Sequence, residues 1–309
     1  MIGHSGWVRA LAVRSDGSII SGSSDNTIRI WDPVTGEQAA CFEAYSGWGV
    51  GALAALPDGR VVSGSDDGTV RIWDPVSDRA LSCLQDHNGK VCALAILPDG
   101  RIVSGSDDES IRIWDQNSGA EIARLEGHGG EVRALAVLPD GRIVSGSEDE
   151  TVRLWSTDLV RSAGLLEKND GGASIPAIVS HERILWGPGS DHFRAQGGLI
   201  CALAILPDKR LVLGLGDNTI RVWDYVSGRE GARMENHRVQ ADALAILPDG
   251  RIVSGSGDGR IRIWDGVSGR EIACLEGHAG RICALTVLPD GRLVSGSADK
   301  TLRLWKIAA

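Results

Sequence analysis

The sequence predicts an all-β fold in which four-stranded antiparallel sheets stand side by side in a closed ring. Three observations predict it. A unit of about 41 residues recurs along the chain, each unit holds four short β-prone runs, and the apolar residues in these runs are too continuous for sheets with one solvated face. Sheets buried on both faces need neighbours on both sides, and a closed ring leaves no exposed end. We therefore expect a β-propeller formed as a single domain by residues 1–309.

The clearest sign of the repeat is a tryptophan that closes the third β-prone run of each unit. The segment LPDGRIVSGSDDESIRIWD, which starts at residue 97, returns with few changes at residues 138 and 247. The spacings between successive closing tryptophans are 42, 41, 41, 68, 41 and 41 residues. These tryptophans are Trp31, Trp73, Trp114, Trp155, Trp223, Trp264 and Trp305.

The long spacing of 68 residues indicates a further, degenerate unit. A shift of 41 residues from Arg142 reaches Arg183, and residues 193–196 then stand where residues 152–155 stand in the preceding unit. This predicts a degenerate repeat at about residues 166–197, followed by loss of its outer run. We therefore expect eight blades, with the fifth and eighth lacking an outer strand. The alternative is seven blades, with residues 156–198 as an irregular insertion.

Each unit is predicted to be a four-stranded meander. In one unit the first three runs are residues 132–139, 142–147 and 151–155, and residues 121–126 show an outer run. Val, Ile, Thr and Trp favour strands, whereas the Asp-Gly, Ser-Asp and Ser-Gly pairs between the runs favour tight turns. Short turns between consecutive runs predict antiparallel neighbours.

Composition and charge argue against several classes of partner. The chain has 32 Lys and Arg against 41 Asp and Glu, a net charge of −9, whereas nucleic-acid binding normally needs a broad basic face. No run approaches the length of about 18 apolar residues that a membrane-spanning helix needs, and the first residues do not resemble a signal peptide. We expect a cytoplasmic or nuclear protein that binds neither nucleic acid nor membrane.

The cysteines show no metal or redox motif. The 6 cysteines form no Cys-x-x-Cys pair and no short cluster with histidine. The separation of Cys83 from Cys92 recurs between Cys274 and Cys283, as duplication of a sequence unit would produce. We expect no bound metal and no cofactor.

Three recurring motifs connect the chain to a known family. A Gly-His pair precedes the first run, as at Gly3-His4 and Gly127-His128, an Asp such as Asp149 stands in the turn before the third run, and Trp-Asp follows it, as at Trp31-Asp32. The chain resembles the WD-repeat β-propeller family, with repeats like those of the G-protein β-subunit, over nearly its whole length. The degenerate unit departs from this pattern, because four other residues replace its His, Ser, Asp and Trp. They are Asn169, Trp186, Ser190 and Gln196.

The resemblance implies a buried, hydrogen-bonded tetrad of His, Ser, Asp and Trp in each regular blade. The expected tetrads include His128, Ser145, Asp149 and Trp155; His237, Ser254, Asp258 and Trp264; and His278, Ser295, Asp299 and Trp305. Ser, His and Asp also form the catalytic triad of many hydrolases. An active site, however, normally occurs once in a domain, whereas this set of residues recurs in unit after unit around the ring. We therefore expect no catalytic residues and no small-molecule substrate.

Differences between the units indicate where a partner would bind. The resemblance implies that the loops leading into the first strands and the turns before the third strands share one face. Aromatic residues stand in the leading loops of the first two units, where other units have polar residues, and acidic residues stand in the turns of units two to four. We expect a partner site there, next to a channel mouth that includes Arg9, Gly51, Cys92, Arg133, Ser174, Cys201, Asp242 and Cys283. The predicted site residues are Trp7, Arg9, Tyr45, Trp48, Asp66, Asp107, Arg133 and Glu148.

A second interpretation of two of these aromatic residues stays open. Tyr45 stands where other units have His, so it is alternatively a buried substitute for that residue. Trp48 alternatively fills the one-residue insertion behind the spacing of 42 residues.

The function that the sequence favours is a non-catalytic protein–protein interaction scaffold. Its expected partner is a peptide or domain, basic in character and with an apolar anchor, bound on one face of the propeller. One alternative is a regulatory or sensor module of a larger multidomain signalling protein. A propeller enzyme is a further alternative, but it would need a unique His, Asp and Glu cluster in the channel, and the sequence shows none.

Overall fold

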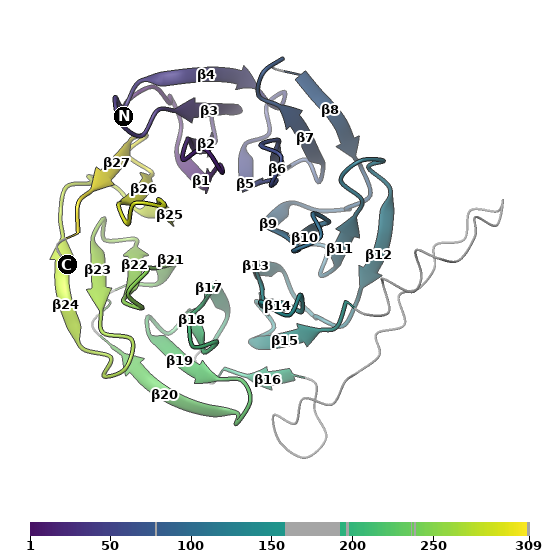
Figure 1. The fold of residues 1–309 in the computed structure, drawn as a ribbon. Coiled ribbons are helices and arrows are strands. Elements are labelled where there is room, and N and C mark those ends of the chain that lie inside the picture. Colours follow the sequence, from purple (N-terminus) through teal and green to yellow (C-terminus); the bar gives the residue numbers. More distant parts are fainter. Residues whose placement is uncertain (78, 158–191, 196–197, 236, 238, 308–309) are drawn as a thin grey trace.

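The computed structural model describes residues 1–77, 79–157, 192–195, 198–235, 237 and 239–307. The strands of these residues form seven antiparallel sheets arranged around a central axis (Figure 1). Six of the sheets have four strands and the last has three. Consecutive strands are neighbours in every sheet, which confirms the predicted meander.

The first strand of each sheet lies nearest the axis. Its residues are short and apolar, mostly Ala, Leu, Val and Ile, so seven such strands can converge on a narrow channel. The first strands are β1 (Val8–Val13), β5 (Val50–Ala55), β9 (Val91–Ile96), β13 (Val132–Val137), β17 (Ile200–Ile205), β21 (Ala241–Ile246) and β25 (Ile282–Val287).

The second strand is buried along its whole length in every sheet. Continuous burial confirms that the sheets are covered on both faces, as the unbroken apolar runs predicted. The second strands are β2 (Ile19–Ser23), β6 (Val61–Ser65), β10 (Ile102–Ser106), β14 (Ile143–Ser147), β18 (Leu211–Leu215), β22 (Ile252–Ser256) and β26 (Leu293–Ser297).

The third strand carries the closing tryptophan of each unit. Its other residues are mostly apolar or β-branched, together with an Arg that recurs two residues before the tryptophan. The third strands are β3 (Thr27–Trp31), β7 (Val70–Asp74), β11 (Ile111–Trp114), β15 (Thr151–Trp155), β19 (Ile220–Asp224), β23 (Ile261–Trp264) and β27 (Leu302–Trp305).

The outer strand forms the circumference of the ring and is the most exposed (Figure 1). Only its inward-facing residues pack on the third strand, so its sequence is more polar. The outer strands are β4 (Gln38–Glu43), β8 (Arg79–Leu84), β12 (Glu121–Leu125), β16 (His192–Arg194), β20 (Arg229–Met234) and β24 (Glu271–Leu275).

The hydrophobic core is divided among the spaces between neighbouring sheets. Each of seven clusters of described residues joins one sheet to the next, and the last of them joins the final sheet to the first. The expectation of eight blades is therefore wrong, and the seven-bladed alternative has the right number. Val144 of β14 and Leu211 of β18 share one cluster, and β13 contacts β17 directly, so no further sheet stands between them.

The end of the degenerate repeat has a different role from the one predicted. Residues 193–196 were expected to form a third strand in a fifth blade, but His192–Arg194 pair with Thr151–Arg153 as the outer strand of the fourth blade. A strand-forming segment can pair with any free sheet edge that it can reach. Without His192–Arg194, β15 would have a free edge of this kind. Residues 158–191 and 196–197, which include most of the predicted repeat at 166–197, lie outside the described residues.

The ring closes between the last blade and the first. The last blade has three strands, as predicted for the final unit. The Met1 amino group donates to the Leu302 carbonyl at 3.0 Å, and the Leu302 N–H donates to the Met1 carbonyl at 3.1 Å. The Arg292 guanidinium also donates to the Pro33 carbonyl at 2.8 Å. The first residue of the chain thus lies against β27 of the last blade (Figure 1).

Candidate functional site

The predicted tetrad is present in the fourth blade. His128 Nδ1 lies 2.8 Å from Asp149 Oδ2, and His128 Nε2 lies 2.7 Å from Ser145 Oγ. The Trp155 indole N–H donates to the same Ser145 oxygen at 2.8 Å. The network links the leading loop to the second and third strands of its own blade. Equivalent networks surround Ser21, Ser104 and Ser295.

The tetrad aspartates are held ionised by their surroundings. Burial by itself raises the pKa of Asp149, but hydrogen bonds from His128, Thr151 and the Gly129 N–H outweigh it and leave that pKa well below its ordinary value. In the last blade the same kinds of bond lower the pKa of Asp299 to about 2. Ser145 has no exposed surface, so its hydroxyl cannot meet a substrate. The geometry is that of a structural lock.

Tyr45 takes the place of the tetrad histidine in the second blade. Its hydroxyl lies 2.8 Å from Ser63 Oγ, the side chain is 5% exposed, and the Arg71 guanidinium stacks over its ring at 4.3 Å. The expectation of an exposed partner-binding Tyr45 is therefore corrected. A phenol reaches the buried serine as an imidazole does, so the alternative interpretation of a buried substitute is right.

The sixth blade contains a rearranged tetrad. His237 Nε2 lies 2.7 Å from Ser254 Oγ, as predicted, but Asp258 accepts a bond from Arg262 at 2.8 Å, and Arg262 Nη1 lies 3.2 Å from His237 Nδ1. The predicted His–Asp contact is thus replaced by an Asp–Arg–His chain. Burial, together with the Arg262 charge, lowers the pKa of His237 to about 4.

The fifth blade lacks a tetrad serine, because Leu213 stands at that position. Its Asp217 instead accepts a bond from Arg221 at 2.7 Å.

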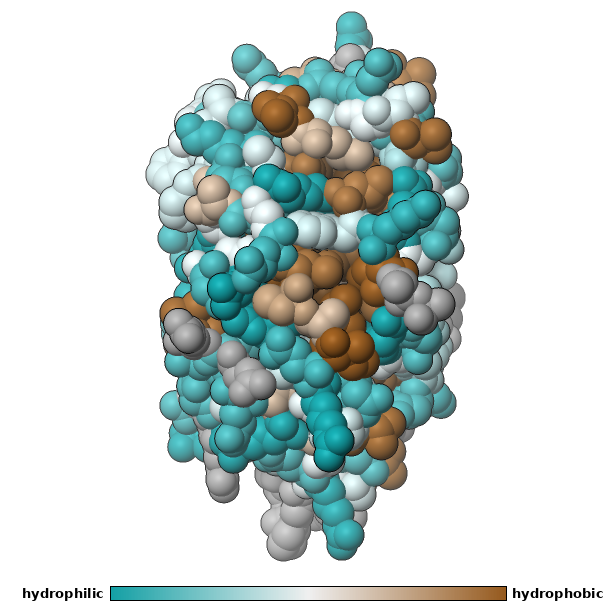
Figure 2. Space-filling view, turned by 90° about the vertical axis from the view of Figure 1, so that its left-hand side faces the viewer, coloured by the Kyte–Doolittle hydropathy of each residue, from teal (hydrophilic) through white to brown (hydrophobic). Residues whose placement is uncertain are grey.

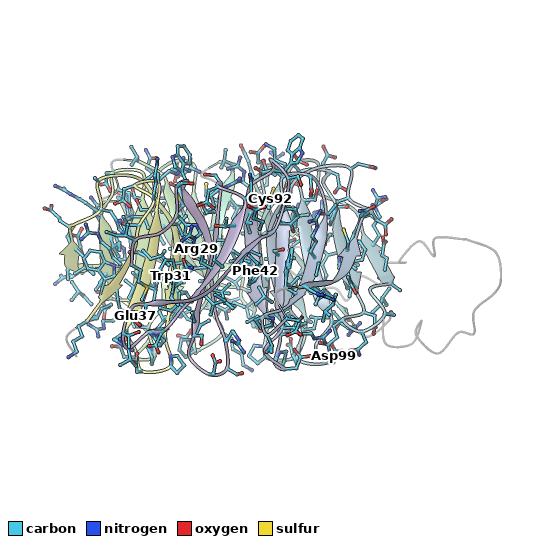
Figure 3. All side chains as sticks on the ribbon, turned by 90° about the horizontal axis from the view of Figure 1, so that it is seen from above. Arg29, Trp31, Glu37, Phe42, Cys92 and Asp99 are labelled. Carbon is cyan, nitrogen blue, oxygen red and sulfur yellow. The ribbon has the colours of Figure 1, made fainter. Side chains whose placement is uncertain are left out.

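The predicted channel mouth lies on the face that carries the leading loops, called here the leading face. Figure 3 shows Cys92 near this face, with Asp99 and Glu37 toward the opposite one. A hollow of about 380 Å³ opens at the mouth. Its lining residues are Trp7, Arg9, Gly51, Lys90, Cys92, Glu131, Arg133, Cys201, Asp242, Arg281 and Cys283.

The structure brings together seven of the eight residues that were expected at the mouth, and Ser174 lies outside the described residues. Lys90, Glu131 and Arg281 line the hollow as well but were not among the predicted site residues. Their position in the leading loops, equivalent to that of Trp7, was the signal that could have identified them.

Arginines partly neutralise the predicted acidic surface. Arg9 of the first blade pairs with Asp66 of the second at 2.5 Å, and Arg133 pairs with Glu148 at 2.5 Å. Asp107 makes no such ion pair within the described part of the chain. The three predicted acids therefore differ in compensation: Asp66 and Glu148 are paired with arginines, whereas Asp107 is the least compensated.

The thiols at the mouth are poor nucleophiles and poor metal ligands. Burial raises the pKa of Cys201 to about 12, and burial likewise raises the pKa of Cys92, which also donates to Glu131. Both thiols therefore stay protonated at neutral pH, whereas the thiolate is the reactive form. No group of three or more His, Cys, Asp or Glu among the described residues could hold a metal ion.

Two tryptophans project from neighbouring leading loops, as predicted. Trp7 is 53% exposed and Trp48 is 55% exposed. The Trp7 backbone exchanges hydrogen bonds with Ser24, and a Cβ at Gly49 would meet Ser24 Cα at 3.1 Å, so both loops pack on the same turn. The structure therefore holds two large apolar side chains on one part of the leading face.

Seven radial antiparallel sheets, four of them with the regular tetrad, are closed around a channel and define a seven-bladed β-propeller. The chain belongs to the family of the WD domain, G-beta repeat. The family model matches residues 1–32, 36–74, 79–115, 119–156, 190–224, 229–265 and 269–306. Propellers of this family generally act as protein-interaction scaffolds. A comparison with curated proteins found no match. Across the ranges that the structure describes, no helix is long and apolar enough to cross a membrane.

Proposed function

We propose that this propeller is a non-catalytic scaffold that binds a peptide or domain on its leading face, with Trp7 and Trp48 as the anchors. The exposure of these two side chains on neighbouring loops is the observation that carries the proposal. Tryptophan is enriched at binding hot spots because it buries a large apolar area with little loss of conformational freedom.

The equivalent positions of other blades support this role. Lys90, Glu131 and Arg281 occupy leading-loop positions like that of Trp7, so the scaffold does not require an apolar residue there. An exposed tryptophan that the fold does not need is typical of a binding surface.

Charge supports a partner that carries Lys or Arg beside its apolar anchor. Asp107 lies on the same face without an ion pair to another described residue, so it can receive a cation from outside. Asp66 and Glu148 already pair with arginines, so they attract a partner's cation less strongly. A charge of this kind contributes to association rate and specificity more than to affinity.

The proposal is tested by comparing partners captured by three proteins: the wild type, the double variant Trp7→Ala with Trp48→Ala, and a matched control. The control is Val76→Ser with Val226→Ser, which removes two exposed apolar residues from turns on the opposite face. Loss of a true hot-spot aromatic costs about 2 kcal/mol or more, so the tryptophan variant should bind at least about 30-fold more weakly with an unchanged melting temperature.

A partner that binds the tryptophan variant as well as it binds the wild type, and that is lost with the control, would place the site on the opposite face. For a partner that behaves as expected, Asp107→Lys should slow association and reduce its dependence on salt concentration.

A further inference from the structure

Side chains at the channel mouth form bridges between neighbouring blades, and one position in this series is vacant. Each bridge joins the second residue of a first strand to the residue just before the first strand of the next blade. The bridged pairs are Cys92 with Glu131, Cys201 with Gln240, and Asp242 with Arg281. Between the second and third blades the same two positions hold Gly51 and Lys90. Because glycine has no side chain, no bridge forms there.

Lys90 therefore keeps an unused donor. Its side chain is exposed, lines the hollow at the mouth, and makes no ion pair or hydrogen bond with any residue in the described ranges. At the equivalent position of the last blade, Arg281 pairs with Asp242 of the sixth blade. That pair shows which kind of group meets a cation at this level of the channel. The counterpart missing opposite Lys90 is thus a carboxylate.

A second unused donor lies on the other side of Gly51. Arg9 Nη1 donates to Asp66 Oδ2 at 2.5 Å, whereas Arg9 Nη2 makes no hydrogen bond within the described part of the chain. A Cβ at Gly51 would lie 3.6 Å from this Nη2. Asp66 Oδ1 would lie 3.5 Å from the same Cβ, but this oxygen is buried and the Asp66 charge is already matched by Arg9. The space over Gly51 is thus flanked by two cations.

The charges that line the hollow also favour an anion. The cations of the lining are Arg9, Lys90, Arg133 and Arg281, and its acids are Glu131 and Asp242. Arg133 and Arg281 have acid partners of their own, so the excess positive charge lies at Lys90 and Arg9. Hydrophilic residues also cover much of the circumference (Figure 2), so polarity alone does not distinguish the mouth. Two unused donors around one vacant position do.

We propose that the mouth binds a carboxylate of the partner, carried by a Glu side chain, over Gly51 and between Lys90 and Arg9. This inference rests on the proposed function, since it takes the leading face as the binding face. Gly51 lies within β5, below the loop that carries Trp48. A carboxylate on a methylene stem can reach it while the partner's backbone stays beside the tryptophans. Asp107 is not part of the lining and keeps its role toward a cation of the partner.

The probe is acetyl-Glu-amide, compared with the matched probes acetyl-Gln-amide and acetyl-Lys-amide. Low salt concentration keeps the charges weakly screened. Binding is measured on the full chain from the backbone NMR shifts of Gly51 and Lys90. We expect acetyl-Glu-amide to bind with a dissociation constant of about 10 mM, and about 5-fold more tightly than either matched probe.

Variants on either side of the vacant position test the assignment of the two donors. Lys90→Glu should reverse the preference and favour acetyl-Lys-amide, because it removes one donor and adds an acid. Lys209→Glu is the matched control, at an exposed lysine in the turn after β17 on the opposite face, and it should bind all probes like the wild type. Gly51→Asp supplies a carboxylate from the chain itself, so it should abolish binding of acetyl-Glu-amide.

Several outcomes would overturn the proposal. These are equal binding of the Glu and Gln probes, stronger binding of the Lys probe, unchanged preference in Lys90→Glu, and absence of shifts at about 100 mM. Stronger binding of acetylglycine, whose carboxylate is at a chain end without a stem, would also contradict it. The double variant Trp7→Ala with Trp48→Ala should bind acetyl-Glu-amide like the wild type, because the probe has no apolar anchor. Failure of the anchors in partner capture is therefore distinguishable from failure of the mouth.

Discussion

At the scale of single residues, the buried tetrad serine is the point where each regular blade is tied together. In the fourth blade Ser145 Oγ meets both the Trp155 indole N–H and His128 Nε2, and Asp149 meets the other nitrogen of that histidine. Removing one member leaves the other polar groups buried without a hydrogen-bond partner. The resulting loss in free energy of unfolding is larger than the contribution of the lost hydrogen bond alone. The same three residue types that suggest a hydrolase triad thus act as a structural network here.

Asp149→Ala should therefore lower the free energy of unfolding by about 1–3 kcal/mol, because His128 Nδ1, the Thr151 hydroxyl and the Gly129 N–H would lose their acceptor. Denaturant unfolding measures this loss. The matched control is Asp140→Ala, at an exposed turn carboxylate, which should cost less. Equal losses for the two variants would show that the network does not stabilise the blade.

The free energy of unfolding should also depend on pH through His237. Burial and Arg262 lower its pKa from 6.5 to about 4, so between these values the unfolded chain binds a proton that the native protein does not. Stability should therefore fall as pH decreases from about 6.5 to 4, by up to about 3 kcal/mol from this group. Unfolding curves of wild type and His237→Gln over this range test the effect. Identical pH slopes for the two proteins would contradict it.

At the scale of elements, the second strand determines how closely two blades can approach. A Cβ at Gly146 of β14 would lie 2.4 Å from Ile200 Cγ2 of β17 in the next blade. The same close approach occurs at Gly64 with Val91 and at Gly255 with Ile282. The glycine of the Ser-Gly-Ser segment is thus required by contact between blades.

Gly146→Ala should destabilise the protein by about 1–3 kcal/mol, because overpacking at this contact must push two sheets apart. Gly129→Ala is the control, since a Cβ there would meet no atom within 4 Å, and it should change stability by less than about 0.5 kcal/mol. Thermal and denaturant melts distinguish the two. A tolerated Gly146→Ala would mean that the blades are not in tight contact at this strand.

At the scale of the whole molecule, the ring is a closed series of equivalent contacts between blades. Val8 of the first blade packs against Gly296 of the last, as Val132 packs against Gly105 between the third and fourth blades. Closure places every inner strand between two neighbours, so the leading loops are held on one face. This geometry positions Trp7 beside the channel mouth.

Val8→Ala and Val132→Ala should reduce stability by similar amounts, about 2 kcal/mol each, because both side chains are fully buried and each loses two methyl groups. Denaturant unfolding compares the two variants directly. A much smaller loss for Val8→Ala would indicate that the ring is open between the last blade and the first.

The sequence by itself determined the strand order within each blade and the tetrads of the regular units, whereas it left open whether Tyr45 and Trp48 are exposed or buried. These features depend on neighbours along the chain, since strand periodicity, turn residues and the repeated Trp spacing act within one unit. Only the tertiary structure decided the number of blades, because His192–Arg194 suits a third strand or an outer strand equally well until a free edge is known. The repeat pattern also did not predict the hydrogen bond between Asp258 and Arg262. Such ion pairs depend on the distances between charged side chains in the folded ring. The repeated order of residue types along the chain does not specify these distances.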